Sequence, residues 1–379
     1  MFSLPVLLSL LAAFAAPILA APAHEEPETQ FSPAYRYDKH ETNYRKLPKR
    51  SQLPRVPGHL EGSAWLWGDD DGLGRLNFLT PQRVYQSMKE VKTGDMVPLN
   101  LPVKLVNPPL FNRPAFNHTF MKFGDGTAAV LDEQYQMNTQ TSTQWDGFHH
   151  FAHLESGIFY NGCTEDDIPG ANLTNNHKCG IQEWAAHGIA GRGVLLDFAS
   201  WAELQGLSAP AFAATNITFP QLQAVAKHQG LDLRNAADGG DIRIGDILLV
   251  RSGFTKAYVA LTPSERKTLA ELPYAAGPDG LHRFIGVAQS AEMVDWLHDS
   301  YFSAVAGDQP AFESWPAQGP LSLHEQVLSL WGTGLGEFFD LEKLAEMCKK
   351  RRKWTFFVTS APFNVDRGIA TWANAIAIL

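Results

Sequence analysis

The densest group of potentially reactive side chains lies in one segment, Gln140-Thr-Ser-Thr-Gln144-Trp-Asp146-Gly-Phe-His149-His150-Phe-Ala-His153. Positions 140, 144, 146 and 150 share one parity, so on an extended chain their side chains project from one face. That face would gather two amide oxygens, a carboxylate and an imidazole. Oxygen ligands suit a divalent cation, and a neighbouring imidazole can carry protons. The spacing indicates either a metal site with a proton carrier or a polar strand whose histidines are satisfied by hydrogen bonds.

Other residues of the same segment are candidates for contacting a substrate. Trp145 lies beside Asp146 and could stack on a flat ligand. The alternative is that Trp145 and Phe148 belong to the hydrophobic core. The full set of candidates for substrate contact is Trp145, Phe148, His149 and His153.

Several common catalytic motifs are missing from the sequence. The nearest approach to a G-x-S-x-G elbow, Gly206-Leu-Ser-Ala-Pro210, has proline in place of the second glycine. Gly332-Thr-Gly-Leu-Gly336 has the wrong spacing for a nucleotide-binding loop. His324-Glu325 begins like a zincin motif, but Leu328 occupies the position of the second histidine. These chemistries are therefore set aside.

Short helical and extended patterns alternate along the chain and must position these residues. Helix signals begin at an N-cap residue or proline and end at glycine or at basic residues; they cover 80–94, 220–229, 290–300, 322–331 and 340–353. In particular, Ser322-Leu-His-Glu325 reads as a capping box that opens the fourth of these helices. Strand signals are short apolar runs; they cover 193–198, 247–251, 303–306 and 354–359. The alternation predicts an α/β or α+β fold around a sheet or barrel.

The N-terminal residues and the composition point to a secreted globular protein. The chain has 379 residues and a formal net charge of −9, which argues against a basic nucleic-acid binder. Residues 2–23 carry no charged side chain and end in small residues, as in a secretory signal peptide, although an uncleaved membrane anchor is the alternative. We expect a signal peptide over 1–20, a polar segment over 21–50 and a single catalytic domain over 51–379.

The polar segment ends in Leu47-Pro-Lys-Arg50. Its low hydrophobicity argues against its joining a core, and the dibasic end suggests a pro-segment removed after Arg50. A disordered arm that is never cleaved is the alternative.

The three cysteines and three sequons fit an oxidising compartment. Cys163 and Cys179 bracket a polar loop and are natural disulfide partners, which leaves Cys348 as a free thiol. No C-x-x-C pair exists, which argues against a cysteine zinc site. The possible N-glycosylation sites are Asn117, Asn172 and Asn216.

From about Trp67 to its end, the chain resembles the putative cyclase family that includes bacterial kynurenine formamidase and isatin hydrolase, especially the fungal branch of that family. The resemblance rests on the cluster at 140–153 and on four further blocks: Trp67-Gly-Asp-Asp-Asp-Gly-Leu-Gly-Arg-Leu-Asn77, Phe159-Tyr-Asn-Gly162, Gly191-Arg-Gly-Val-Leu-Leu-Asp197 and Gly245-Asp-Ile-Leu-Leu-Val-Arg-Ser-Gly253. Four later residues continue it: Asp308, Pro310, His324 and Glu337. It implies a swivelling β/β/α domain with a central mixed β-barrel flanked by helices, and a homodimer.

The family signature is H-x-G-T-H-x-D-x-P-x-H, in which the first two histidines and the aspartate bind a divalent metal and the last histidine handles protons. Asp146 and His150 match the signature. Gln140 and Gln144 stand where the ligand histidines would be. An amide oxygen is a weaker and harder ligand than imidazole, so the affinity of the site for Mn²⁺, Mg²⁺ or Ca²⁺ should rise relative to its affinity for Zn²⁺. The resemblance also implies that His324 and Glu337 complete the metal site; the alternative is an ordinary helix-face histidine and a helix-terminal glutamate.

Together these features predict a secreted, metal-assisted hydrolase or cyclase that acts on a C–N or C–O bond of a small amide, lactam, lactone or ester. Asp146, His324, Glu337, Gln140 and Gln144 would hold a divalent ion, either Mn²⁺ or Zn²⁺, with Mg²⁺ or Ca²⁺ as further options. His150 and Asp146 would be the catalytic residues. The expected partner is a small-molecule substrate, with no nucleic acid and no membrane in the mature form. The alternatives are a small-molecule binder that has lost its metal and a metal-free cyclase or isomerase of secondary metabolism.

Overall fold

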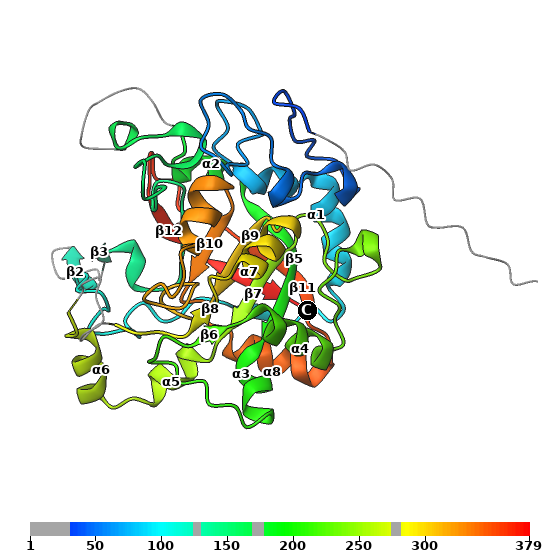
Figure 1. The fold of residues 1–379 in the computed structure, drawn as a ribbon. Helices are drawn as coiled ribbons and strands as arrows, with labels where there is room; N and C mark the ends of the chain where they lie inside the picture. The colour runs from blue at the N-terminus through cyan, green and yellow to red at the C-terminus, as the bar shows by residue number, and fades with distance from the viewer. Residues whose placement is uncertain (1–30, 124–129, 169–177, 274–281) are drawn as a thin grey trace, which may run out of the picture. The chain divides into compact units, whose positions relative to one another are not determined.

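The structure, a computed structural model, describes residues 31–123, 130–168, 178–273 and 282–379 (Figure 1). Residues Phe31–Leu379 form one compact unit built on a nine-stranded mixed sheet. The strand order is β1-β13-β11-β5-β7-β9-β10-β4-β12. The bounds are β1 Met96–Pro98, β4 Gln144–Asp146, β5 Ile189–Asp197, β7 Ile247–Arg251, β9 Ala304–Gly307, β10 Gly334–Glu337, β11 Thr355–Ser360, β12 Ala370–Trp372 and β13 Ala375–Ile378.

Helices surround this sheet (Figure 1). The α-helices are α1 Pro81–Ser87, α2 Ile181–His187, α3 Phe198–Leu204, α4 Phe219–Gln229, α5 Phe254–Ala260, α6 Pro263–Ala270, α7 Ala291–Asp299 and α8 Glu342–Arg351, and a π-helix spans Glu325–Leu330. The 3-10 turns are Tyr44–Lys46, Arg50–Gln52, Gly74–Phe78, Met88–Glu90, Thr139–Thr141, Tyr160–Gly162, Glu165–Asp167 and Ala236–Asp238. Two small sheets pair β2 Asn117–Phe123 with β3 Val130–Gln136 and β6 Asn216–Ile217 with β8 Gly286–Val287. Helices α1 and α4 pack on β5, and α3 packs on β7.

The centre of the sheet explains the apolar runs of the sequence. Strands β5, β7, β9 and β10 are parallel neighbours, and nearly all their residues are buried. Parallel strands covered on both faces read as continuous apolar runs, as these do. The predicted mixed α/β fold with flanking helices is confirmed. The expected barrel takes the form of a curled half-barrel, because β1 and β12 are edge strands within the described sheet.

The predicted helix over 322–331 forms with a different geometry. The Ser322 hydroxyl and the His324 backbone N–H both donate to the Glu313 carboxylate, at 3.1 and 2.9 Å. The expected capping box does not form: His324 is the N-cap residue without a side-chain cap, and the Glu325 carboxylate pairs with His153 instead. Most of the segment is a π-helix instead, and π-helical turns are rare and often found at functional sites.

The polar segment that precedes residue 51 joins the core from residue 31 onward. Tyr37, Tyr44 and Leu47 are 8%, 9% and 2% exposed and belong to the main hydrophobic cluster. The prediction that low hydrophobicity keeps this segment out of the core is therefore wrong for residues 31–50. A few apolar side chains are enough to anchor a polar segment to the core when each one packs into its own space there. Cleavage after Arg50 stays a prediction, and the predicted signal peptide lies outside the described residues.

Hydrogen bonds and an ion pair connect the same segment to α7 and to the loop before β7. The Tyr44 hydroxyl donates to the Ile242 carbonyl at 3.0 Å. The Arg50 backbone N–H donates to Asp299 at 2.7 Å, and its side chain forms an ion pair with Asp295. These contacts tie residues 31–50 to elements far along the chain.

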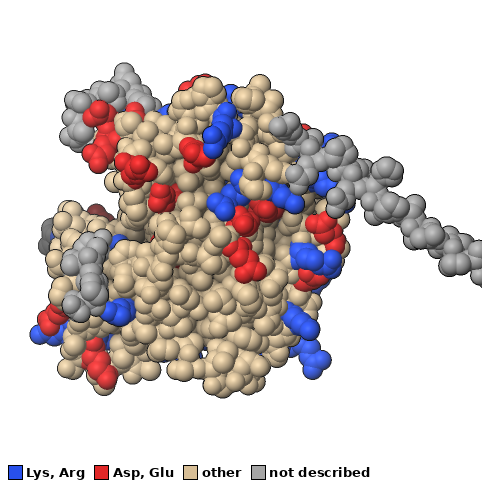
Figure 2. Space-filling model, viewed as in Figure 1, with Lys and Arg blue, Asp and Glu red and all other residues tan. Residues whose placement is uncertain are grey.

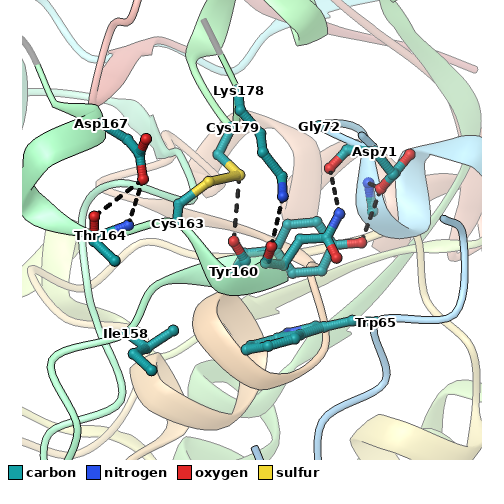
Figure 3. The surroundings of a disulfide bond; sticks show 12 residues. Trp65, Asp71, Gly72, Ile158, Tyr160, Cys163, Thr164, Asp167, Lys178 and Cys179 are labelled. Atoms are coloured by element: carbon teal, nitrogen blue, oxygen red, sulfur yellow. Dashed lines mark hydrogen bonds between the residues drawn. A yellow bond between two sulfur atoms is a disulfide. The ribbon is translucent and has the colours of Figure 1, made fainter. Parts of the chain in front are cut away.

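The predicted disulfide between Cys163 and Cys179 is confirmed (Figure 3). It joins the segment that follows β4 to Cys179, which immediately precedes the residue that caps α2. Cys348 is a buried free thiol in α8, and burial raises its pKa to about 12. Asn117 and Asn216 are exposed on their strands, whereas Asn172 lies outside the described residues.

Charged groups of both signs share the surface. On the face seen in Figure 2, basic and acidic side chains lie next to each other, and exposed ion pairs such as Lys256–Glu203 illustrate the arrangement. Among the described residues, no helix combines the length and apolar character needed to cross a bilayer.

Candidate active site

Strand β4 carries the central residues of the candidate site and lies between β10 and β12. Its antiparallel register with β10 places Gln144 opposite Glu337 and Asp146 opposite Leu335. His324 comes from the start of the π-helix, which leads back to β10. Residues from the middle and the C-terminal third of the chain therefore meet at one place.

The side chains of this group converge closely enough to share one ion. Nitrogen atoms of His150 and His324 and a carboxylate oxygen of Asp146 all lie within 4.8 Å of one another. His324 Nε2 is 4.0 Å from Asp146 Oδ2 and 3.1 Å from Glu337 Oε1. His150 Nε2 is 4.0 Å from Asp146 Oδ1. The proposed spatial convergence is present, while the metal-binding role of each residue stays a prediction.

The two glutamines lie in this site, where their amide nitrogens donate hydrogen bonds to the acidic groups. Gln140 Nε2 donates to Asp146 Oδ1. Gln144 Nε2 donates to Glu337 Oε2 at 2.8 Å and to Gln140 Oε1 at 3.1 Å. Buried carboxylates attract N–H donors, so in this arrangement the amides present nitrogen to the acidic groups. Gln144 Oε1 accepts no hydrogen bond among the described residues, and the role of both glutamines as metal ligands stays a prediction.

Unpaired acceptors show that the donor set fits a divalent cation. Asp146 is fully buried, and neither its Oδ2 nor Gln144 Oε1 has a hydrogen-bond donor among the described residues. A buried acceptor without a donor is unfavourable by about 1–3 kcal/mol, and more for a charged group. A cation held by Asp146, His150 and His324, with Glu337 beside His324, would give Asp146 Oδ2 a partner through ligand types that Zn²⁺ and Mn²⁺ accept.

The surroundings of the site shift the pKa values of its titratable groups in different directions. Burial lowers the pKa of His150, which favours the neutral imidazole. Burial opposes protonation of His324 too, yet Glu313 and Glu337 raise its pKa well above that of ordinary histidine. Burial, reinforced by the charge of Asp146, raises the pKa of Glu337 to about 7. Widely separated pKa values within one cluster are typical of acid–base sites.

Glu313 is a site residue that the sequence analysis missed. It is 1% exposed and accepts the backbone N–H of His324, while its Oε1 lies 3.3 Å from His324 Nδ1. A carboxylate on one ring nitrogen fixes the tautomer and leaves the other nitrogen facing the site. The only signal in the sequence was a lone acidic residue within the apolar run 311–315.

We expect Glu313→Ala to weaken binding of a divalent cation by about 10–100-fold, the usual range for loss of such an outer partner. Glu313→Gln keeps an acceptor and should lose less. Calorimetric titration of the chelator-treated variants with Mn²⁺ measures the difference. Equal Mn²⁺ affinity in all three proteins would show that Glu313 does not position His324.

Two of the predicted substrate contacts are wrong, because the side chains belong to the core. Trp145 alternates with Gln144 and Asp146 on β4, so its ring points to the opposite face, where it packs on Phe339 and donates to Ser360. Phe148 is fully buried against the rings of Tyr160 and Trp184.

The other two predicted contacts also lie away from the cluster. His149 is 2% exposed and close to the disulfide. His153 pairs with Glu325 at 3.1 Å and with Ser156. Each is held by surroundings other than the group around Asp146, so this structure offers neither one to a substrate there.

Comparison with known proteins identifies the family of the chain. No curated protein matches the sequence significantly. Among solved structures, the crystal structure of a novel cyclase is similar with a TM-score of 0.70 and 26% identity, and the match covers 84% of this chain and 99% of that one. Isatin hydrolase A from Labrenzia aggregata, bound to benzyl benzoate, matches with a TM-score of 0.47 and 14% identity over 75% of this chain and 93% of that one. The family model described as "Putative cyclase" matches residues 99–314, more than half of the sequence. The chain therefore belongs to the putative cyclase family.

Proposed function

We propose that this protein is a secreted, metal-assisted hydrolase or cyclase that acts on a C–N or C–O bond of a small amide, lactam, lactone or ester. The observation that carries the proposal is the convergence of Asp146, His150 and His324 within 4.8 Å, beside the buried Glu337. Membership of the cyclase family supports the reaction class. The confirmed disulfide supports an oxidising destination.

The side chains of the site would have distinct roles in the reaction. A bound divalent ion would polarise a carbonyl and lower the pKa of a water molecule. Asp146, His324 and Glu337 hold the site together, and Glu313 orients the His324 ring. His150 is the group that accepts a proton and returns it to the leaving group, because its side chain is 22% exposed whereas those of His324 and Asp146 are 7% and 0% exposed. It can therefore meet a substrate.

The test is to prepare the full chain free of metal, add Mn²⁺, Zn²⁺ or Mg²⁺, and assay aryl formamides, isatin and lactones. We expect turnover of at least one class that stops with chelator and returns with a divalent ion. Because Glu337 has a pKa of about 7, the cation displaces a proton below that pH, so its affinity should rise between pH 5.5 and 8. An affinity that is flat across this range would contradict the assigned ligand set.

A second candidate is a metal-free cyclase or isomerase that uses His150 and Asp146 as an acid–base pair. The observation that favours it is that both glutamine amides donate to the carboxylates, which partly satisfies them without a cation. Such an enzyme would keep its full activity in chelator. A protein that retains no ion after dialysis and turns over no substrate would instead be a small-molecule binder.

We also propose that the protein is a homodimer that uses the β2–β3 hairpin as part of its interface. The hairpin exposes large apolar side chains, which a monomer rarely leaves in contact with water; they are Phe120, Met121, Phe123, Val130, Leu131 and Tyr135. We expect the double variant Phe120→Asp and Leu131→Asp to shift the protein from dimer to monomer in analytical ultracentrifugation. An identical sedimentation profile for the variant would exclude this face as the interface.

A further inference from the structure

A second group of potential metal ligands consists of one histidine and the two cysteines of the disulfide, and it shares no residue with the candidate active site. A ring nitrogen of His149 and the sulfur atoms of Cys163 and Cys179 lie within 4.8 Å of one another. The three residues are 2%, 1% and 1% exposed. They come from three separate segments, so the missing C-x-x-C spacing says nothing about this cluster. Ligands that are distant in sequence are brought together by the fold.

The His149 ring has no other evident task. The side chain is almost completely buried, and apart from a contact with the Lys178 backbone that is too poor for an ordinary hydrogen bond, its ring nitrogens have no hydrogen-bond partner among the described residues. A buried polar group without a partner is unfavourable, so such a group calls for an explanation. The atoms that face it include the two cysteine sulfurs, and imidazole with thiolate is a preferred ligand set for zinc.

We propose that the reduced form of this protein binds a thiophilic divalent cation, such as Zn²⁺, through His149, Cys163 and Cys179. A dithiol reductant supplies the two electrons: the protein disulfide becomes two thiols while the reductant becomes a disulfide. The cation then replaces the two thiol protons, which are released to solvent. Two thiolates and one imidazole leave a fourth position for an oxygen ligand, and the Tyr160 carbonyl oxygen lies 3.2 Å from Cys179 Sγ (Figure 3).

The disulfide links two of these segments, whereas the bound ion would link all three. His149 immediately precedes His150 on the turn after β4, and Cys179 immediately precedes the residue that caps α2. In the oxidised chain the disulfide joins the 163 loop to α2. In the reduced chain the ion would join both of these to the turn as well. The inference does not depend on the proposed catalytic function.

The test uses full-length chain carrying Cys348→Ser, made in a reducing cytosol and titrated with Co²⁺. Thiolate ligation gives a near-ultraviolet charge-transfer band, which the carboxylates and imidazoles of the candidate active site cannot produce. We expect the band in the reduced chain, its absence in the oxidised chain, and its loss in Cys163→Ser. His149→Ala should weaken or shift the band, whereas His153→Ala, four residues away and paired with Glu325, should leave it unchanged.

Co²⁺ that binds the reduced chain without a charge-transfer band would overturn the proposal, as would a band that is the same in His149→Ala. A second measurement covers variants that fail to fold. Equimolar Zn²⁺ should raise the melting temperature of the unsubstituted chain more when it is reduced than when it is oxidised, because only the reduced chain offers thiolates. An equal rise in both forms would place Zn²⁺ elsewhere and contradict the assignment.

Discussion

Replacing His150 with alanine is expected to lower kcat by about 10²–10⁴-fold on any substrate that the protein turns over, the usual contribution of a positioned acid–base group. The reason is its place in the cluster. His150 Nε2 lies 4.0 Å from the Asp146 carboxylate, and its lowered pKa keeps the ring neutral near pH 7. A neutral imidazole can take a proton from water or from an internal nucleophile.

The loss should have a recognisable pH dependence. With the divalent ion kept at saturating concentration, so that protonation of Glu337 does not limit its binding, the unsubstituted enzyme should lose activity only as the pH falls below 6.5, because burial lowers the pKa of His150. This acidic limb should disappear with His150. Stopped or continuous assays between pH 4.5 and 8.5 measure both effects. His228→Ala is the matched control, since His228 is exposed on α4. A His150→Ala protein with unchanged kcat would remove this residue from the mechanism.

Removal of residues 1–50 is expected to destabilise the protein severely, whereas removal of residues 1–30 leaves every described residue in place. The longer deletion takes away Tyr37, Tyr44 and Leu47, which are buried in the core. Each such side chain contributes about 1.5–3 kcal/mol by burial, so the three together contribute about 5 kcal/mol or more. A whole domain is commonly stable by only about 5–15 kcal/mol. The longer deletion should therefore be largely unfolded or aggregated.

Urea unfolding followed by circular dichroism compares the two truncated proteins. Leu47→Ala in the full chain is the point variant that keeps the segment but opens a cavity, and it should lower the free energy of unfolding by about 2–5 kcal/mol. If the chain that begins at Ser51 unfolds at the same urea concentration as the chain that begins at Phe31, residues 31–50 are a removable pro-segment after all.

Local pattern was sufficient for much of the fold. The strand Ile247–Arg251 and the helix Phe219–Gln229 form almost where the apolar run and the capping residues predict them. The loop between Cys163 and Cys179 is short enough for the disulfide to follow from spacing. Each of these features depends on neighbours within about 15 residues, which the sequence displays directly.

The sequence fell short where distant residues compete for the same group. Glu325 pairs with the distant His153 and Ser322 donates to Glu313, and the predicted capping box is replaced by the start of a π-helix. Alternation on β4 sends Trp145 to the core while Gln144 and Asp146 face the site. Neither outcome is visible without knowing which elements pack together.

By itself, the sequence determined the elements, the disulfide and the identity of the polar groups near Asp146, because these follow from local spacing and residue chemistry. The family resemblance implied that His324 and Glu337 complete the site, and the tertiary structure showed that their side chains come together there. Only the tertiary structure decided that the glutamine amides turn their nitrogens toward the carboxylates and that residues 31–50 are part of the core. The physical reason is that burial and hydrogen-bond competition are set by the pairing of β4 with β10 and by packing between segments far apart along the chain.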